Sequence, residues 1–229
     1  MHAVTSAHAP GTIIVPTSDL SRYTGFWTAL LGLQVPAGST LATCAGVGIA
    51  ENLNRCLEHL QGAWVWVLND DHDFAPTLLL DLLDRNVDVI APLTTRRSPP
   101  FQPVVFGAYD PQTNMWPTLA WADLPSDPDA LYQVGACGGA GLLIRRHVLD
   151  RLTKPIFEIG RTRSDGLSED LWLCKKVHDA GFKVYVDCKH RLGHTHPVTY
   201  WPNFVHNRWC VGADLGNGIS IDLLPRDVG

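Results

Sequence analysis

One short stretch constrains this chain more than any other. The apolar run Trp64–Leu68 leads directly into the polar cluster Asn69–Asp73. A short apolar run rich in tryptophan and valine is typical of a buried strand. The cluster after it holds three carboxylates, an amide and an imidazole, and like charges this close repel one another. The sequence therefore predicts that the strand ends at a site for a positively charged partner.

Strand-like and helix-like segments alternate on both sides of this stretch. We expect strands at 11–17, 64–68, 87–93 and 183–187, and helices at 19–31, 50–60, from Pro76 onward and at 168–182. Ser18 or Asp19 and Ser168 are the expected helix caps. Residues 135–152 run from a glycine cluster through a strand into a helix, 94–128 are irregular, and the ordered pattern ends near His196. This order predicts an α/β fold with a Rossmann-like, mainly parallel central sheet flanked by helices.

Composition narrows the class of protein. The 229 residues are 45% hydrophobic, enough for the core of one domain, and the net charge of −5 argues against non-specific nucleic-acid binding. Arg96 and Arg97, like most basic pairs here, are interpreted as solvated surface. No apolar run approaches the roughly 20 residues that cross a bilayer, and no signal peptide is recognised. The six scattered cysteines form no CxxC pair, so we expect reduced thiols and a cytoplasmic location.

The acidic cluster lies where ligands bind in α/β sheets, beyond the carboxyl end of a strand. Asp71 and Asp73 have the spacing D-x-D, and Asn69 with Asp71 gives a second such frame. Carboxylate oxygens are the ligands that Mg²⁺ or Mn²⁺ prefers. The alternative is a set of capping and turn residues before the helix at Pro76.

Three further segments carry candidate residues. Glu169 and Asp170 open a helix, where acids stabilise the helix dipole but can also act as a general base. His194 follows Gly193, which permits close approach of a ligand, so it is a better metal-ligand candidate than His196. The glycines from Gly135 to Gly141 are not a dinucleotide fingerprint and more simply allow close approach to a substrate.

Taken in order, these segments resemble a glycosyltransferase of the GT-A fold, in the broad family 2-like group and of the compact bacterial or phage type. The resemblance covers Gly11 to about His196. It is carried by IIVPT, WVWVLNDDHDFAPTLLLDLL, VDVIAPL, GGAGLLIRR, SEDLWLCKKVHDAGFKVYVD and the GH at 193–194.

The resemblance implies an activity. A D-x-D loop in this family holds a divalent cation, Mn²⁺ or Mg²⁺, on the diphosphate of a nucleotide-sugar donor, most commonly a UDP-sugar. Carried over, Asp71 is a metal ligand in either frame, Asp73 in one of them, and His194 completes the shell. Asp170 would be the catalytic base of an inverting reaction, with Glu169 orienting the loop. The acceptor could be a DNA base, a protein or a glycan.

The resemblance also implies an organisation. One GT-A domain would fill residues 1–229, with a nucleotide-sugar-binding half at about 11–95, a smaller acceptor and catalytic half at about 96–200, and a tail of unknown role at 201–229. A phage-encoded chain would act in the host cytoplasm. The nucleotide sugar is expected to contact Pro16, Thr17, Asn52, Arg55, Asp70, Asp71 and Gly139. For Asn52 and Arg55, surface or capping roles are equally compatible with the sequence.

Two other functions use the same residues. A metal-dependent phosphohydrolase or nucleotidyltransferase would use two metals about 4 Å apart and more acids converging on one site. A non-catalytic module would bind the nucleotide sugar without turnover. Substitution of Asp170 distinguishes an enzyme from a binding module. In an enzyme, loss of Asp170 should abolish turnover and spare donor binding.

Overall fold

The computed structural model describes residues 1–17, 23–46, 48–113, 115–159, 168–196, 198–205, 207–216 and 218–223. The expected caps Ser18 and Asp19 lie outside this part of the chain. The helices are α1 (Thr24–Gly32), α2 (Ile49–Leu57), α3 (Leu78–Asp84), α4 (Arg146–Leu149) and α5 (Glu169–Asp179), with one 3₁₀ turn, η1 (Trp121–Asp123). No helix in the described part of the chain is long and apolar enough to cross a membrane.

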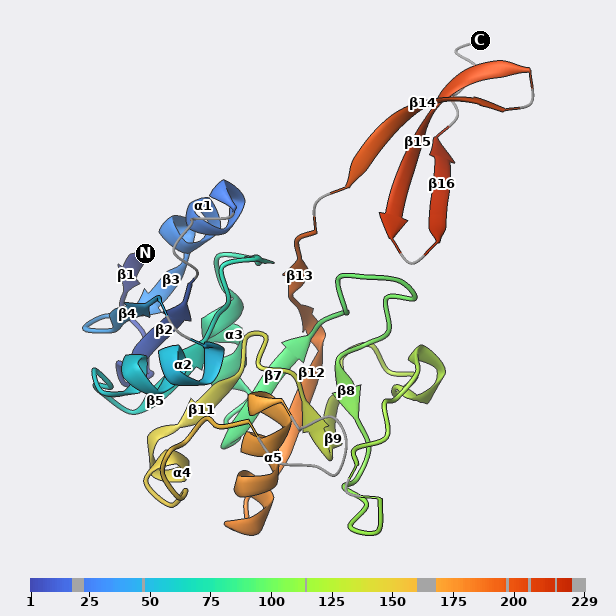
Figure 1. Ribbon diagram of the computed structural model, residues 1–229. Coiled ribbons are helices and arrows are strands. Elements are labelled where there is room, and N and C mark those ends of the chain that lie inside the picture. Colours follow the sequence, from blue (N-terminus) through green and yellow to red (C-terminus); the bar gives the residue numbers. More distant parts are fainter. Residues whose placement is uncertain are drawn as a thin grey trace.

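The central sheet has seven strands (Figure 1). In spatial order they are β4 (Thr40–Cys44), β2 (Thr12–Pro16), β5 (Trp64–Val67), β11 (Leu143–Arg145), β7 (Val89–Leu93), β12 (Val184–Arg191) and β9 (Leu131–Val134). Smaller pairs are β1 (His2–Val4) with β3 (Gln34–Pro36), β8 (Val105–Phe106) with β10 (Ala136–Cys137), and β6 (His72–Asp73) with β13 (Gly193–His194).

The expectation of a mainly parallel sheet is wrong, because the sheet is mixed. β11 pairs antiparallel with both β5 and β7, and β9 pairs antiparallel with β12. The other three pairings, β4 with β2, β2 with β5 and β7 with β12, are parallel. It follows that β4, β2, β5, β7 and β12 all point the same way. Their carboxyl ends share one edge of the sheet with the amino ends of β11 and β9.

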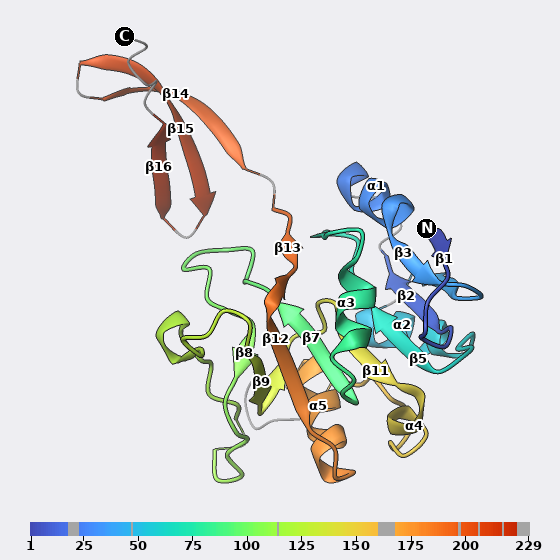
Figure 2. The ribbon, with the colours of Figure 1, turned by 180° about the vertical axis from the view of Figure 1, so that it is seen from behind.

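Each face of the sheet is covered by its own helices and has its own apolar core. Leu53 of α2, Val148 of α4 and Leu173 of α5 pack on one face, which is toward the viewer in Figure 1. Phe26 of α1 and Leu79 of α3 pack on the other, which Figure 2 shows from behind. The strand Trp64–Val67 is buried along its whole length because alternate residues enter the two cores.

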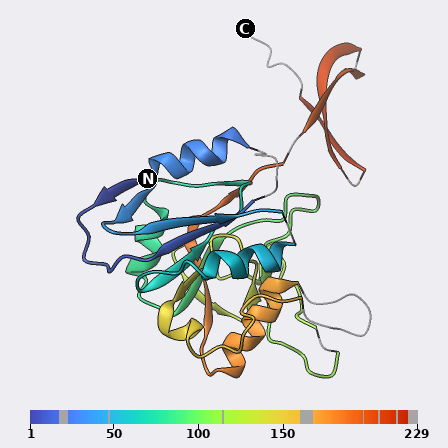
Figure 3. The same cartoon turned by 60° about the vertical axis from the view of Figure 1, so that its left-hand side comes forward.

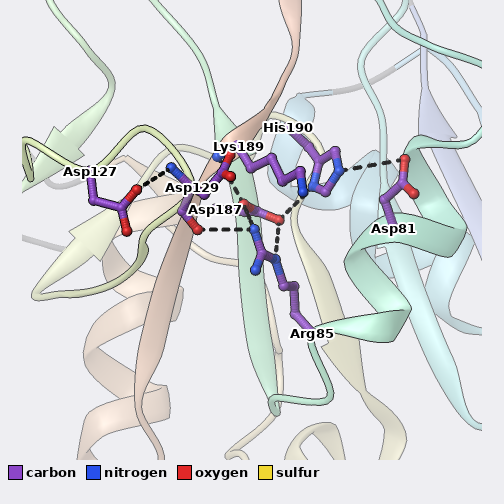
Figure 4. Close-up of polar contacts among 7 residues, drawn as sticks. All are labelled: Asp81, Arg85, Asp127, Asp129, Asp187, Lys189 and His190. Carbon is purple, nitrogen blue, oxygen red and sulfur yellow. Dashed lines mark hydrogen bonds and ion pairs between the residues drawn. The ribbon is translucent and has the colours of Figure 1, made fainter.

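A buried ion pair joins the second face to the β12 strand (Figure 4). Arg85, at the end of α3, donates two hydrogen bonds of 2.8 and 2.7 Å to the Asp187 carboxylate, which is fully buried. His190 Nδ1 lies 2.8 Å from the same carboxylate. Burial alone would raise the pKa of Asp187, but these hydrogen bonds hold it below its usual value. This carboxylate is therefore fixed by structural contacts with Arg85, His190 and the Lys189 backbone N–H.

The expectation that order ends near His196 is also wrong. A three-stranded antiparallel sheet follows, made of β14 (Thr199–Val205), β15 (Arg208–Gly216) and β16 (Ile219–Leu223). Figures 1 and 3 show this sheet standing apart from the body of the molecule, joined to it through β13. Its register puts Phe204, Val211 and Ile221 on one face, and all three side chains are exposed.

Candidate functional site

Asp71 lies in the loop that leaves the carboxyl end of β5, and its side chain is buried. Its carboxylate accepts a hydrogen bond of 2.7 Å from Arg97 Nη1 on Oδ2. The Asp71 carbonyl accepts a 2.8 Å bond from the Thr195 backbone N–H, which ties this loop to the segment after β13. Burial alone would raise the pKa of Asp71, but a hydrogen bond from His194 and nearby positive charge lower it to about 2. The carboxylate is therefore ionised at neutral pH.

His194 faces Asp71 from the opposite strand. β13 pairs antiparallel with β6, so His194 lies across from His72. His194 Nδ1 lies 3.0 Å from the Thr95 carbonyl. A carbonyl oxygen can only accept a hydrogen bond, so Nδ1 is the donor and Nε2 is the ring nitrogen that faces Asp71. Nε2 is 3.4 Å from Asp71 Oδ2, and that hydrogen bond raises the pKa of His194. A carbonyl that fixes the far nitrogen is the usual support of a metal-binding imidazole.

His72 is a third member of the group that the sequence interpretation did not include. Its side chain is fully buried, its ring lies 5.5 Å from that of His194, and burial lowers its pKa to about 4. Nδ1 accepts a 3.2 Å hydrogen bond from the Asn69 backbone N–H, so in the neutral ring Nε2 carries the hydrogen. Nε2 is 3.8 Å from Asp71 Oδ1 and has no hydrogen-bond partner among the described residues. His72 ligates a cation only if it gives up the bond from Asn69.

These three side chains fit a divalent cation. One ligand atom from each of Asp71, His72 and His194 lies within 4.8 Å of the others. Asp71 Oδ1 is buried without a hydrogen-bond partner in the described part of the chain, which is costly unless something else occupies that lone pair. A carboxylate with imidazole suits Mn²⁺ better than Mg²⁺, which prefers oxygen ligands throughout. Asp73, the other predicted ligand, is exposed and does not join this group.

Arg97 holds the position of a cation in this arrangement. Its guanidinium bonds the same Asp71 oxygen that His194 approaches, while the Arg97 side chain itself stays 45% exposed. Arg97 is exposed, as a solvated surface residue would be, but the sequence interpretation missed its contact with Asp71. A half-exposed arginine can swing away from a buried carboxylate when another cation arrives, because its remaining donors face solvent.

The predicted nucleotide-binding residues fall in different places. Thr17, after β2, donates a 2.7 Å hydrogen bond from Oγ1 to Asp70, which is fully buried. Pro16 and Thr17 thus lie beside the acidic loop at the carboxyl edge of the sheet. Asn52 is buried on α2, whereas Arg55 is exposed and pairs with Glu51 one helical turn away at 2.6 Å.

Asp170 is the second carboxylate at this edge. It lies in the first turn of α5, and its Oδ2 accepts a 3.1 Å hydrogen bond from the Gly139 N–H at the amino end of β11. Oδ1 accepts the Leu171 N–H at 2.8 Å and the Ser168 hydroxyl. Ser168 occupies the predicted cap position but its hydroxyl goes to Asp170 instead of a backbone N–H. The structure therefore brings Asp170 to the glycine segment. Its Oδ2 accepts only one hydrogen bond from the described residues.

Two neighbours define the surroundings of Asp170. A Cβ on Gly138 would lie 2.6 Å from the Val104 side chain, so glycine lets this segment approach α5 and Val104, the residue before β8, together. Burial and then the Asp170 charge raise the pKa of Glu169. Of the two acids, Asp170 is the one whose carboxylate accepts hydrogen bonds from the Gly139 and Leu171 backbone N–H groups.

The arrangement offers two chemically different carboxylates at one edge of the sheet. Asp71 and His194 belong to a group that fits a cation beyond β5 and β12, and Asp170 is an oriented hydrogen-bond acceptor beside the segment that precedes β11. A ligand bound at this edge can have one end neutralised by a cation and the other exposed to a base.

Comparisons with known proteins agree with this fold. No protein-family model and no curated protein sequence matches the chain. The structure is similar to that of A197 from STIV, with a TM-score of 0.54 and 12% identity over 81% of this chain and 86% of that one. It is also similar to GalNAc-T7 solved with UDP, GalNAc and Mn²⁺, with a TM-score of 0.55 and 12% identity over 81% of this chain and 43% of that one. At this identity the likeness shows the fold alone, and it confirms the predicted GT-A-like fold.

Proposed function

We propose that this chain is a metal-dependent glycosyltransferase that moves a sugar from a nucleotide-sugar donor to an acceptor hydroxyl. The observation that carries the proposal is the pairing of Asp71 with His194, beside an Asp71 oxygen that has no partner among the described residues, at the sheet edge that also holds Asp170. The GalNAc-T7 structure, whose fold is similar, contains UDP, GalNAc and Mn²⁺, so a UDP-sugar and Mn²⁺ are the first donor and ion to test.

The donor would lie along the carboxyl edge of the sheet. Asp71 and His194 would hold Mn²⁺, with His72 joining them only after rotation. When bound, the ion neutralises the charge that builds on the leaving diphosphate. Pro16, Thr17 and the buried Asp70 form the wall on which the nucleotide would rest.

Asp170 would act as the base. Its Oδ2 accepts the proton of the acceptor hydroxyl while that oxygen forms a bond to the anomeric carbon. The bond from the anomeric carbon to the diphosphate oxygen breaks, and its electron pair leaves with the nucleoside diphosphate. A single displacement of this kind inverts the anomeric configuration. Gly139 and Leu171 donate hydrogen bonds from their backbone N–H groups to the carboxylate, which keeps it oriented.

The two other functions fit less well. A two-metal hydrolase or nucleotidyltransferase needs more acids at one site, whereas the described residues supply a single aspartate to the cation group. A non-catalytic module would not need a carboxylate held as Asp170 is. We further place donor binding in residues 11–95 and catalysis in 96–200. The six cysteines form no disulfide, which suits a reducing compartment such as the cytoplasm.

The test is a transfer and donor-hydrolysis assay over a panel of nucleotide sugars with Mn²⁺, Mg²⁺ or excess chelator. We expect one nucleotide sugar to be consumed with Mn²⁺ and not with chelator, and NMR to show an inverted anomeric centre in the product. Equal consumption in chelator would refute the metal assignment. A product of retained configuration would refute the role of Asp170.

A further inference from the structure

A second cavity lies at the opposite edge of the sheet. It has a volume of about 440 Å³ and is lined by the end of α5, by residues 106–109, 116 and 119, and by the carboxyl end of β9. β9 pairs antiparallel with β12, with Val134 across from Val184. The carboxyl end of β9 therefore lies at the amino end of β12, whereas His194 follows the carboxyl end. None of the site residues described above lines this cavity.

Aromatic side chains dominate the cavity, around Trp116. Its ring lies 5.1 Å from that of Tyr109, tilted by 51°, and 5.9 Å from that of His178, tilted by 34°. Tyr132 also lines the cavity, and Lys175 Nζ lies 5.7 Å from the centre of the Tyr109 ring. The tilts leave no parallel slot of the kind that a flat nucleobase would enter.

One polar atom here lacks a partner. Trp116 is only 5% exposed, and its indole Nε1 has no hydrogen-bond acceptor among the described residues. A buried N–H without an acceptor is rare in native proteins and usually marks a bound water or ligand. His178 differs, because its Nε2 is already 2.6 Å from the Gly135 carbonyl. The described residues therefore supply the indole with no acceptor, and an oxygen of a bound ligand would provide one.

The charges in the cavity indicate a neutral ligand. Lys175 is paired with Asp179 at 2.6 Å, so the two compensate each other. Gln133, which is exposed, adds an uncharged amide. A cavity of this size, with aromatic walls and a few hydrogen-bonding groups, suits a small ring-shaped molecule. A sugar ring combines apolar C–H faces with hydroxyl oxygens and no charge, whereas a phosphate or nucleotide would need an uncompensated cation.

The cavity and Asp170 share two structural elements. α5 carries Asp170 in its first turn and His178 in its last, which at 1.5 Å per residue places them about 12 Å apart along the helix. The segment from Gly135 to Gly139 also connects them, since Gly135 lines the cavity and Gly139 binds Asp170. Two or three linked sugar rings can span such a distance.

We propose that this cavity binds a sugar residue of the acceptor, remote from the reacting hydroxyl, so that the acceptor is an oligosaccharide or polysaccharide chain. The assignment of that sugar to the acceptor rests on the proposed glycosyltransferase function. Binding of a neutral saccharide in the cavity does not, and the two are tested separately.

The binding test uses gluco- and chito-oligosaccharides, from monosaccharides to hexasaccharides, titrated by calorimetry without donor or metal. We expect saturable binding of at least one longer chain, weakened about tenfold in Trp116→Phe, which keeps the ring and loses the N–H. Gln133→Ala, at an exposed position, is a second cavity variant that should also weaken binding. Trp201→Phe, on the separate C-terminal sheet, is the matched control and should bind as the wild type does.

The outcomes separate the two proposals. With the chain that binds, Trp116→Phe should raise KM for transfer and leave kcat unchanged, whereas Asp170→Asn should bind the chain normally and not turn over. Oligosaccharide binding without any transferase activity would keep the cavity site and refute its assignment to an acceptor. No saturable binding of any member, or equal affinity in the wild type and both cavity variants, would overturn the proposal and leave water as the partner of the indole.

Discussion

The acidic loop after β5 and the start of α5 each present a carboxylate at the same sheet edge, but they hold it differently. Asp71 is surrounded by side chains, with Arg97 at 2.7 Å and His194 at 3.4 Å. Asp170 is held by the backbone N–H groups of Gly139 and Leu171. Side chains can rotate away from a carboxylate when another ligand arrives, whereas the backbone donors of α5 and of the glycine segment before β11 cannot rotate independently. The first carboxylate is suited to exchange its partners and the second to keep its position.

The largest effect should come from the fixed carboxylate. Asp170→Asn keeps the shape of the side chain and removes its ability to take a proton, so we expect turnover to fall by about 10²- to 10⁴-fold. The loss of a helix-terminal charge should cost about 1 kcal/mol of stability or less. Transfer rates measure the turnover, and urea unfolding measures the stability. The control is Asp150→Asn, because Asp150 is an exposed acid paired with Arg146. Near-normal turnover in Asp170→Asn would leave α5 with a capping role only.

Asp71, the carboxylate whose partners can exchange, should control metal binding. We expect Mn²⁺ to tighten UDP binding, and Asp71→Asn to lose about 10-fold or more of that metal-linked affinity because an amide is a weaker ligand than a carboxylate. Calorimetry of UDP with Mn²⁺ and with chelator measures it. Asp187→Asn is the matched control, since it also breaks a buried aspartate–arginine pair but lies away from the site. It should lower stability by about 3 kcal/mol and leave metal-linked binding intact. The same loss in both variants would point to a general structural effect.

A smaller effect, of opposite sign, is expected at Arg97. The guanidinium competes with a metal for Asp71 Oδ2, so Arg97→Gln should bind Mn²⁺ alone several-fold more tightly, by about 1 kcal/mol. Titration of Mn²⁺ by electron paramagnetic resonance measures it without nucleotide. Arg96→Gln, at the adjacent basic residue, is the control. Weaker Mn²⁺ binding in Arg97→Gln would mean that the arginine supports the metal site instead of competing for it.

The smallest effect is on stability at acid pH. The pKa of Asp71 is about 2 in the fold, below its ordinary value of 3.8, so its ionised form stabilises the fold above about pH 4 and this contribution is lost as pH falls toward 2. Between about pH 5 and pH 3 the loss should be about 1 kcal/mol. Urea unfolding of the wild type and Asp71→Asn at both pH values isolates it, because the difference between the two should shrink at the lower pH. A difference that does not change with pH would contradict the lowered pKa.

The sequence predicted the acidic loop of Asp71 and the helix that Glu169 and Asp170 open, because a strand that ends in acids and a capped helix are local patterns. It did not predict the direction of β11, since an apolar run reads the same in either orientation and only its neighbours fix the pairing. This is why a mainly parallel sheet was expected.

The neighbours of Asp71 were harder to find for the same reason. Arg97 meets Asp71 through a tertiary contact 26 residues away in sequence. His72 follows Asp71 directly, but only the pairing of β6 with β13 brings it opposite His194. The C-terminal sheet did have a local signal. Apolar and polar residues alternate in 219–223, and the Asn-Gly pair at 217–218 is typical of a hairpin turn.

The place of β11 has a consequence for how the chain is assembled on the ribosome. β11 lies between β5 and β7, and the two neighbours of β7, β11 and β12, both come later in the chain. A nascent chain that has just completed Leu93 must wait for residues 143–145, which takes roughly 3 to 10 seconds of translation. During that interval β7 is apolar and unpaired. The stretch that would bind the nucleotide is therefore not a folding unit, and its sheet closes only after the glycine segment that meets Asp170 has emerged.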